Sequence, residues 1–206
     1  MRNWFRCFWN LPLVSIIFVL SNVVVYYWDP IQGYRFLLGG SLKVYDVLVK
    51  GEEWRLATAM FLHADLNHLF NNMIIVLFMG NMLERAVGHF SFGSIYLLSG
   101  IFGNVCSLFY KLAAGVASPS IGASGAVFGM DGLLLALVLW NARRMPVITP
   151  IRALFAVLLS LYNGFVSSNI DNAAHVGGLV AGFVLGCLFC IVQNIKYTLK
   201  EKRETK

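Results

Sequence analysis

Six long apolar runs constrain the fold of this chain more than any other feature of its sequence. Charged residues make up only 13% of the 206 residues, whereas soluble domains carry about 25%. Several runs approach the roughly 20 residues that a helix needs to cross a bilayer. The sequence therefore predicts an all-α, polytopic membrane protein with six transmembrane helices. The runs lie at residues 11–27, 66–83, 91–112, 124–140, 147–163 and 174–193.

The first run follows a basic amino-terminal stretch, as the apolar part of a signal peptide would. It is long, however, and no small-x-small cleavage site precedes Asp29-Pro30. We therefore expect it to remain as the first transmembrane helix. The fifth run carries Pro150 and Arg152 near its start, two residues that fit a helix entrance better than a membrane centre.

Basic residues predict the orientation in the membrane. With a cytoplasmic amino terminus, eleven of the sixteen basic residues lie on the inner side, as the positive-inside rule requires. These are Arg2, Arg6, Arg85, Arg143, Arg144, Arg152, Lys196, Lys200, Lys202, Arg203 and Lys206. We expect cytoplasmic termini in a bacterial inner membrane, and we attribute the net charge of +6 to inner loops facing lipid headgroups, not to nucleic-acid binding.

We expect a single membrane-embedded domain over residues 1–206, with a core of about 11–192 and a basic cytoplasmic tail at 193–206. The long connection at residues 29–62 mixes apolar and charged residues at a density suited to the membrane interface, with Tyr45 and Trp54 as anchors.

Polar side chains inside apolar runs are costly in lipid, so each needs a partner or a purpose. His68 and Asn72 lie four residues apart in the second run, hence on one helix face. Ser124 begins the fourth run, and His175 lies at the start of the sixth. In the expected orientation these three helices all run from outside to inside, so the four residues share a shallow depth. This coincidence indicates a site near the outer face.

Glycines at four-residue spacing predict which helices touch, because small residues let two helix backbones approach closely in a membrane. They are Gly125 and Gly129 in the fourth run, and Gly178, Gly182 and Gly186 in the sixth. We expect these two helices to bring Ser124 and His175 together.

The residue types at this site favour acyl transfer. A serine becomes a nucleophile when a neighbouring base takes its proton, and an imidazole suits that task. Gly122 and Gly125 allow a substrate backbone to approach and leave amide N–H groups at a helix start, where they stabilise a developing oxyanion.

The ordered motifs of this chain resemble those of the rhomboid intramembrane serine proteases, over roughly residues 11–192. Each motif alone is weak, but the ordered set on separate membrane helices is specific. The motifs are Trp54-Arg55, His63-xxxx-His68-xxx-Asn72, Glu84-xxx-Gly88, Gly122-Ala123-Ser124-Gly125 and Ala174-His175-Val176-Gly177-Gly178-xxx-Gly182.

The resemblance implies a serine endopeptidase with a Ser124–His175 dyad and no third acidic member. The implied oxyanion donors are the amides of Ala123 and Ser124 and the side chains of His68 and Asn72. Implied substrates are single-pass membrane proteins, cut near the outer end of their helix, and no cofactor or metal is implied.

The resemblance also bears on residues around the dyad. In that family an aromatic residue, often tyrosine, follows the serine by four positions and packs on the catalytic histidine; here it is Phe128, which lacks the hydroxyl. Trp54 and Arg55 are implied to shape the first loop and its contact with lipid. We expect Glu84 to brace the cytoplasmic end of the second helix.

Purely structural roles for the polar residues remain open at this point. His68 and Asn72 fit interhelical hydrogen bonding as well as an oxyanion role, and His63 fits a structural hydrogen bond. A zinc site of His63, His68 and His175 lacks an accompanying motif such as H-E-x-x-H. The four cysteines, Cys7, Cys106, Cys187 and Cys190, have neither metal-site nor disulfide spacing, so we expect buried thiols.

Two acidic residues need separate explanations. Asp171 precedes His175 by four residues and suits a helix N-cap better than an orienting role. Asp131 lies seven residues past Ser124, on the same face and about 10 Å deeper. We expect it to be protonated or bonded to a polar residue such as Asn104.

Two other functions compete with proteolysis. A non-proteolytic rhomboid relative that binds membrane proteins for quality control typically lacks the serine or the histidine, and this chain has both. A transporter or channel would spread polar groups through the bundle, whereas here most gather at one end. The route of substrate entry, between the second and fifth helices or under the loop near residues 163–170, is not predicted.

Overall fold

The computed structural model describes residues 11–140, 148–166 and 170–204. Six long helices coincide with the six apolar runs. They are α2 (Leu13–Trp28), α6 (Leu66–Val87), α7 (His89–Ala114), α8 (Ser124–Trp140), α9 (Pro150–Val166) and α10 (Asn172–Glu204). Four of them, α2, α6, α7 and α10, are long and apolar enough to cross a membrane, while α8 and α9 are shorter apolar helices. The expected polytopic helical fold is confirmed.

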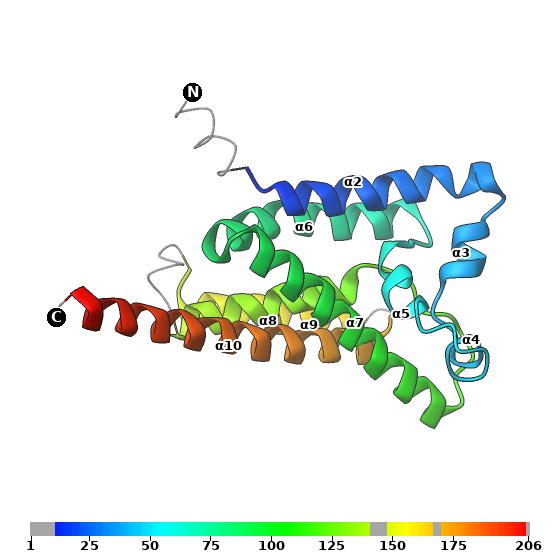
Figure 1. The fold of residues 1–206 in the computed structure, drawn as a ribbon. Coiled ribbons are helices and arrows are strands. Elements are labelled where there is room, and N and C mark those ends of the chain that lie inside the picture. Colours follow the sequence, from blue (N-terminus) through cyan, green and yellow to red (C-terminus); the bar gives the residue numbers. More distant parts are fainter. Residues whose placement is uncertain (1–10, 141–147, 167–169, 205–206) are drawn as a thin grey trace.

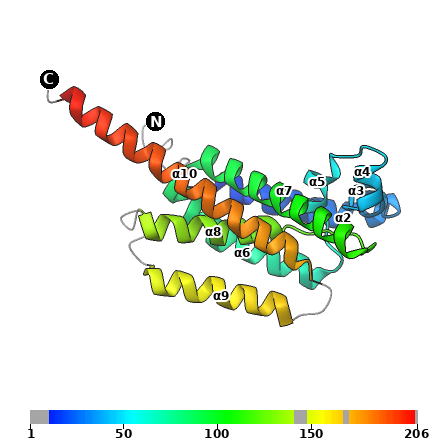
Figure 2. The same cartoon turned by 90° about the horizontal axis from the view of Figure 1, so that it is seen from below.

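Helix α8 lies at the centre of the bundle (Figures 1 and 2). Thirteen of its 17 residues are buried, which explains why its sequence is apolar all round and has no polar stripe. Helices α6, α7, α9 and α10 all pack against α8, and α2 packs against α6 and α7. Helix α9 lies at the edge of the bundle (Figure 2).

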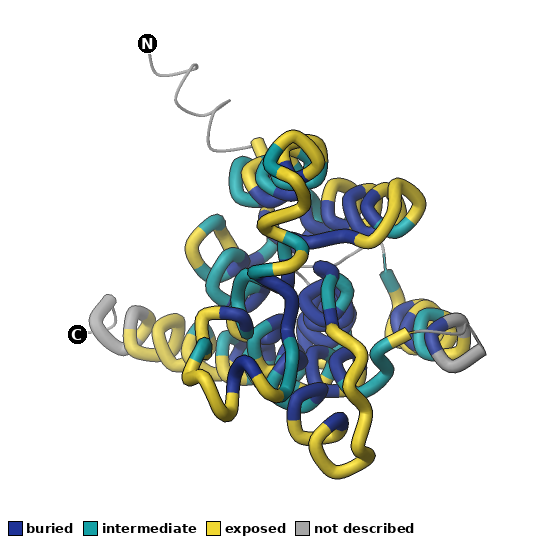
Figure 3. Tube along the Cα trace, turned by 90° about the vertical axis from the view of Figure 1, so that its right-hand side faces the viewer, coloured by how far each residue is buried: buried dark blue, intermediate teal, exposed yellow. Residues whose placement is uncertain are grey.

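Exposed residues cover the outside of the bundle, while buried residues line its centre (Figure 3). Many of the exposed residues are large and apolar. Phe78, Phe90 and Ile151 are 70%, 88% and 70% exposed. Apolar patches of this extent on long helices are typical of a surface solvated by lipid. The protein is therefore an integral membrane protein.

The connection between α2 and α6, called loop 1 below, folds into short helical pieces at one end of the bundle (Figure 1). The pieces are η1 (Pro30–Gln32), α3 (Arg35–Gly40), α4 (Val44–Leu48), α5 (Arg55–Thr58) and η2 (Ala59–Phe61). Tyr45 and Trp54 are 61% and 51% exposed there. Their exposure leaves both rings available to the interface; contact with lipid stays a prediction.

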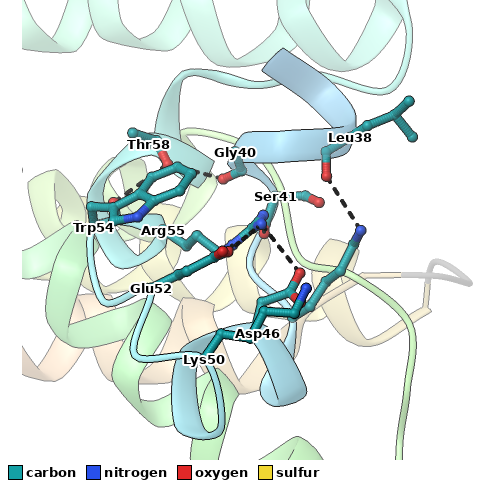
Figure 4. Close-up of polar contacts among 10 residues, drawn as sticks. Leu38, Gly40, Ser41, Asp46, Lys50, Glu52, Trp54, Arg55 and Thr58 are labelled. Carbon is teal, nitrogen blue, oxygen red and sulfur yellow. Dashed lines mark hydrogen bonds and ion pairs between the residues drawn. The ribbon is translucent and has the colours of Figure 1, made fainter. Parts of the chain in front are cut away.

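Arg55 is the buried centre of loop 1 (Figure 4). Its guanidinium binds the carboxylates of Asp46 and Glu52 and donates to the Ser41 carbonyl at 2.9 Å. The Trp54 ring covers it, with Cζ 4.9 Å from the ring centroid. A planar guanidinium with several donors suits such multiple contacts. Arg55 thus holds together pieces of loop 1 that are far apart in sequence.

Glu84 joins α6 to the start of α2. Its buried carboxylate accepts hydrogen bonds from the backbone N–H groups of Val14 and Ser15, both at 2.8 Å, and from the Ser15 hydroxyl. It is also paired with His89. Since the first N–H groups of a helix have no intrahelical acceptor, Glu84 satisfies the start of α2 from a distant helix. The bracing role expected for it is consistent with these contacts.

The structure leaves some residues with predicted roles undescribed, and it changes the prediction for others. Outside the described residues lie Cys7, Arg2, Arg6, Arg143, Arg144, Lys206 and residues 167–169 of the loop near 163–170. The expectation of buried thiols holds for Cys190 but is wrong for Cys106 and Cys187, which are half-buried. The expected tail at 193–206 continues α10 as helix to Glu204.

Candidate active site

Ser124 and His175 are joined by a hydrogen bond of 2.9 Å between Oγ and Nε2. Ser124 is the first residue of α8 and His175 lies in the first turn of α10. The two residues are 51 positions apart in sequence, so only the packing of α8 on α10 brings them together. The His175 side chain is buried. A hydroxyl that is hydrogen-bonded to an imidazole nitrogen is the arrangement that serine nucleophiles require.

Glycines set the contact between these two helices. A Cβ added to Gly178 would lie 2.0 Å from the Gly125 carbonyl oxygen, and one added to Gly182 would lie 2.0 Å from that of Gly129. Neither position has room for a larger side chain, so the backbones of α8 and α10 touch directly. We call this contact the glycine seam. It agrees with the helix pairing that the glycine spacing predicts.

The Phe128 ring stacks on the His175 imidazole, with the centroids 4.2 Å apart. Phe128 follows Ser124 by one helical turn, which places it beneath the histidine. The arrangement implied for this aromatic residue is present. The stacking fixes the plane of the imidazole, whose Nε2 faces Ser124.

Gly122 brings the segment before α8 close to His68 and Asn72. Its φ is +118°, a left-handed conformation that favours glycine. A Cβ there would lie 2.7 Å from His68 Nε2 and 3.8 Å from Asn72 Nδ2. Both nitrogens of α6 therefore lie beside the backbone that leads to Ser124. The Gly122 N–H itself donates to the Ala59 carbonyl at 2.8 Å, so it is not available to a substrate.

His63 orients Asn72. The amide nitrogen of Asn72 lies 3.1 Å from His63 Nε2, and both side chains are buried. Burial lowers the pKa of His63 to about 3, with the nearby His68 adding to the effect. His63 is therefore neutral near pH 7, and its Nε2 can accept one N–H of Asn72. The second N–H of the amide is left for another acceptor.

The two acidic residues have different surroundings. Asp171 caps α10: Oδ1 accepts the Ala174 N–H at 3.1 Å, as expected of an N-cap. Asp131 is buried and hydrogen-bonded to Ser160 of α9. The prediction that Asn104 is its partner is wrong, because the Asn104 side-chain amide donates to the Leu56 carbonyl of loop 1 at 2.8 Å. The Asp131 carboxylate therefore faces α9.

Sequence reasoning missed several residues around the site. Ser107 and Ser120 both bond to Asp171, and Lys111 lies 3.6 Å from its Oδ2. Ser107 and Lys111 are polar residues four positions apart in the third apolar run, and the cost of burying polar groups in lipid is the signal that marks them. Among the residues that the structure describes, no group of three His, Cys, Asp or Glu side chains could hold a metal ion.

Comparison with known proteins assigns the chain to a family. The model of the rhomboid domain matches residues 50–192. The chain is 37% identical over 194 residues to the putative rhomboid protease YdcA of Bacillus subtilis (strain 168), covering 86% of this chain and 88% of that protein. It is 32% identical over 176 residues to rhomboid protease GluP of the same organism, covering 84% of this chain and 34% of that protein.

Plant proteins show a similar relationship. RHOMBOID-like protein 1 of Arabidopsis thaliana is 36% identical over 160 residues, covering 77% of this chain and 40% of that protein. GluP and RHOMBOID-like protein 1 are thus much longer than the region they share with this chain, which spans 34% and 40% of their lengths. The match of the rhomboid domain and the similarity to YdcA along most of both chains lead to one conclusion: this protein belongs to the rhomboid family, which includes the rhomboid proteases.

Proposed function

We propose that this protein is an intramembrane serine endopeptidase in which Ser124 is the nucleophile and His175 the general base. The observation that carries the proposal is the 2.9 Å hydrogen bond between Ser124 Oγ and His175 Nε2. The coarser assignment to a family that includes proteases supports it. A serine hydroxyl needs such a base to react at neutral pH.

The proposed reaction has two steps. Ser124 Oγ attacks the carbonyl carbon of the scissile peptide bond while its proton passes to His175 Nε2. The tetrahedral intermediate collapses, the C–N bond breaks, and His175 returns the proton to the leaving amine. Water, deprotonated by His175, then attacks the acyl-enzyme ester. The ester bond to Ser124 breaks as His175 returns the proton to Ser124 Oγ, which releases the carboxylic acid product. No acidic residue is assigned as a third member of the dyad, and the stacked Phe128 ring restricts the imidazole.

Proposed donors to the oxyanion surround Gly122. The amides of Ala123 and Ser124 stand at the start of α8, where backbone N–H groups have no intrahelical acceptor. His68 Nε2 and Asn72 Nδ2 approach the same backbone from α6. His63 supports the role of Asn72 by accepting a hydrogen bond from one amide N–H, which leaves the other N–H for the oxyanion.

We infer that the substrates are single-pass membrane proteins cut near one end of their helix. Both dyad residues lie in first turns, at the end of the bundle to which loop 1 is hydrogen-bonded. The distribution of basic residues supports an orientation with this end outside and both termini in the cytoplasm. The same pattern supports a bacterial inner membrane.

The experiment that tests the proposal is cleavage of a reporter transmembrane helix by the purified protein in liposomes. Wild type is compared with Ser124→Ala, His175→Ala and the control Ser94→Ala, which removes a serine hydroxyl of α7 far along the chain from the dyad. We expect both dyad variants to lose cleavage and the control to retain it. Labelling by a fluorophosphonate, a reagent for activated serines, should be lost with Ser124→Ala.

A folded wild type that neither cleaves any reporter nor reacts with the fluorophosphonate would refute the proposal. The protein would then be better described as a rhomboid relative that binds membrane proteins without cutting them.

A further inference from the structure

A cluster of one half-buried and three buried polar residues connects the two helices of the dyad at a place that the proposed reaction does not use. Asp171 immediately precedes α10, and its carboxylate meets side chains from two other segments. We call the four residues of this cluster, Asp171, Ser107, Ser120 and Lys111, the Asp171 clamp. Ser107, Ser120 and Lys111 are 0%, 5% and 8% exposed.

One carboxylate oxygen of Asp171 fixes the start of α10. Oδ1 accepts the Ala174 N–H at 3.1 Å, and the Asp171 carbonyl accepts the His175 N–H at 3.1 Å. The first turn of α10, which carries His175, is therefore oriented by Asp171. An N-cap of this kind fixes where a helix begins.

The other oxygen of Asp171 binds the segment that leads to Ser124. Oδ2 accepts the hydroxyl hydrogen bonds of Ser107 and Ser120, whose oxygens lie 3.0 Å apart. Ser120 precedes Ser124 by four residues. The same segment is held a second time by Lys111, whose ammonium donates to the Ser118 carbonyl at 2.8 Å.

Backbone bonds tie this segment to loop 1 as well. Leu42 and Ser120 exchange two hydrogen bonds, of 3.0 and 2.9 Å. The Ser120 backbone is thus fixed on one side by Leu42 while its side chain is fixed on the other by Asp171. A displacement of Asp171 would be transmitted to the chain four residues before the nucleophile.

The surroundings keep the Asp171 carboxylate charged. Burial alone would raise its pKa, but hydrogen bonds from Ser107, Ser120 and Ala174, together with the charge of Lys111, hold that pKa below its usual range. Hydrogen bonds to an ionised acceptor are roughly twice as strong as neutral ones. The clamp is therefore held by charge-assisted hydrogen bonds.

Resting on the proposed function, we propose that Asp171 is a positioning residue for the reaction: its two carboxylate oxygens hold the Ser124 segment and the first turn of α10 in register. Asp171 acts through these backbones and not as a third member of the dyad, since its carboxylate is occupied by the cap and the clamp. The clamp thus fixes the chain four residues before Ser124 relative to the turn that carries His175.

Two substitutions separate the clamp from the cap. Asp171→Ser keeps an N-cap residue but is too short to reach Ser107 and Ser120. Ser120→Ala leaves Asp171 intact and removes its bond to the Ser124 segment. The matched control is Ser41→Ala, since Ser41 is also a buried loop serine, and its Oγ has no hydrogen-bond partner within the described chain.

The measurements are kcat and KM for a reporter helix, the rate of fluorophosphonate labelling of Ser124, and melting in detergent. Misplacement of reacting groups by about 1 Å costs on the order of 100-fold in rate. We expect kcat and the labelling rate to fall by about 10- to 100-fold in both clamp variants, with KM unchanged and the control like wild type. Asp171→Asn, which retains the size of the side chain, should restore part of both rates.

The outcomes separate the two proposals. A wild type that neither cleaves nor labels refutes the proposed function, whatever the variants do. An active wild type with a folded Ser120→Ala variant that labels at the wild-type rate refutes the clamp. If Asp171→Ser fails to fold, Ser120→Ala decides alone, because it removes a single hydroxyl.

Discussion

The Phe128 ring and the His175 imidazole lie nearly parallel, with an angle of 16° between their planes. A stacked pair of this kind contributes about 0.5–1.5 kcal/mol beyond the area it buries. Phe128 has no hydroxyl, so the stacking does not depend on one.

Phe128→Tyr should therefore retain cleavage within about threefold of wild type, whereas Phe128→Ala should lower kcat by about tenfold, as expected for about 1.4 kcal/mol of lost orientation. Steady-state cleavage of a reporter helix checks both. Phe128→Leu, which keeps apolar bulk without a ring, is the control for cavity formation. If Leu and Tyr support equal rates, stacking is not what orients His175.

The glycine seam predicts a strong effect of a single methyl group. Gly182→Ala places a Cβ 2.0 Å from the Gly129 carbonyl oxygen, which forces α8 and α10 apart. Overpacking of this kind costs about 1–3 kcal/mol, and separation of the dyad should reduce cleavage further. Thermal melting in detergent measures the first effect. Gly39→Ala in α3, where an added Cβ meets nothing within 4 Å, should melt like wild type; a similar loss in both variants would contradict the close contact.

The contacts of Glu84 predict that its substitution lowers the stability of the fold far from the dyad. Glu84→Ala leaves two backbone N–H groups and a hydroxyl of α2 without their acceptor, and each unsatisfied buried group costs about 1–3 kcal/mol. With three such groups, we expect a loss of at least about 3 kcal/mol, seen as a lower melting temperature. Glu53→Ala, at an exposed position of loop 1, serves as the control. Unchanged melting of Glu84→Ala would mean that α2 does not depend on this cap.

Loop 1 should lose stability in acid through Asp46. The ammonium of Lys50, hydrogen-bonded to the carboxylate, and the charge of Arg55 hold the pKa of Asp46 below its ordinary value of 3.8, although burial opposes them. A carboxyl whose pKa is lower when folded stabilises the protein above its unfolded pKa, and this contribution disappears as the pH falls through the folded pKa.

Asp46→Asn should therefore melt below wild type at about pH 7, and the difference should shrink as the pH falls below 3.8 through the lowered pKa of Asp46. Melting curves across this range provide the measurement, with Glu53→Gln as a control that shows no such convergence. A constant difference between wild type and Asp46→Asn at all pH values would contradict a role for the charge.

The hydrogen bond between Asp131 and Ser160 predicts that α8 and α9 stabilise each other at this contact. Interhelical hydrogen bonds in membranes contribute on average about 0.6 kcal/mol. In a double-mutant cycle, Asp131→Leu and Ser160→Ala together should be less destabilising than the sum of the single variants by about this amount. Strictly additive losses would show that the two side chains do not stabilise each other.

The sequence was sufficient for the helices and for the pairing of the dyad, because hydropathy and glycine spacing are local patterns that lipid enforces strongly. The sequence did not predict the side-chain hydrogen bonds between segments that are far apart along the chain. Nothing in the sequence pairs Asp131 with Ser160 or Glu84 with Ser15, since those contacts depend on how helices rotate about their axes. The short helices of loop 1 were also unpredicted; they are held by Arg55, whose partners lie up to 14 residues away.

The glycine seam has a consequence for how the dyad behaves as conditions change. Where backbone touches backbone, no side-chain rotamers lie between the two helices, and an interface without rotamers has no alternative packing to populate on warming. The separation of α8 and α10 is then determined by peptide geometry, which is nearly independent of temperature. A lipid-embedded pair of reacting groups thereby keeps its spacing while the side chains around it exchange conformations.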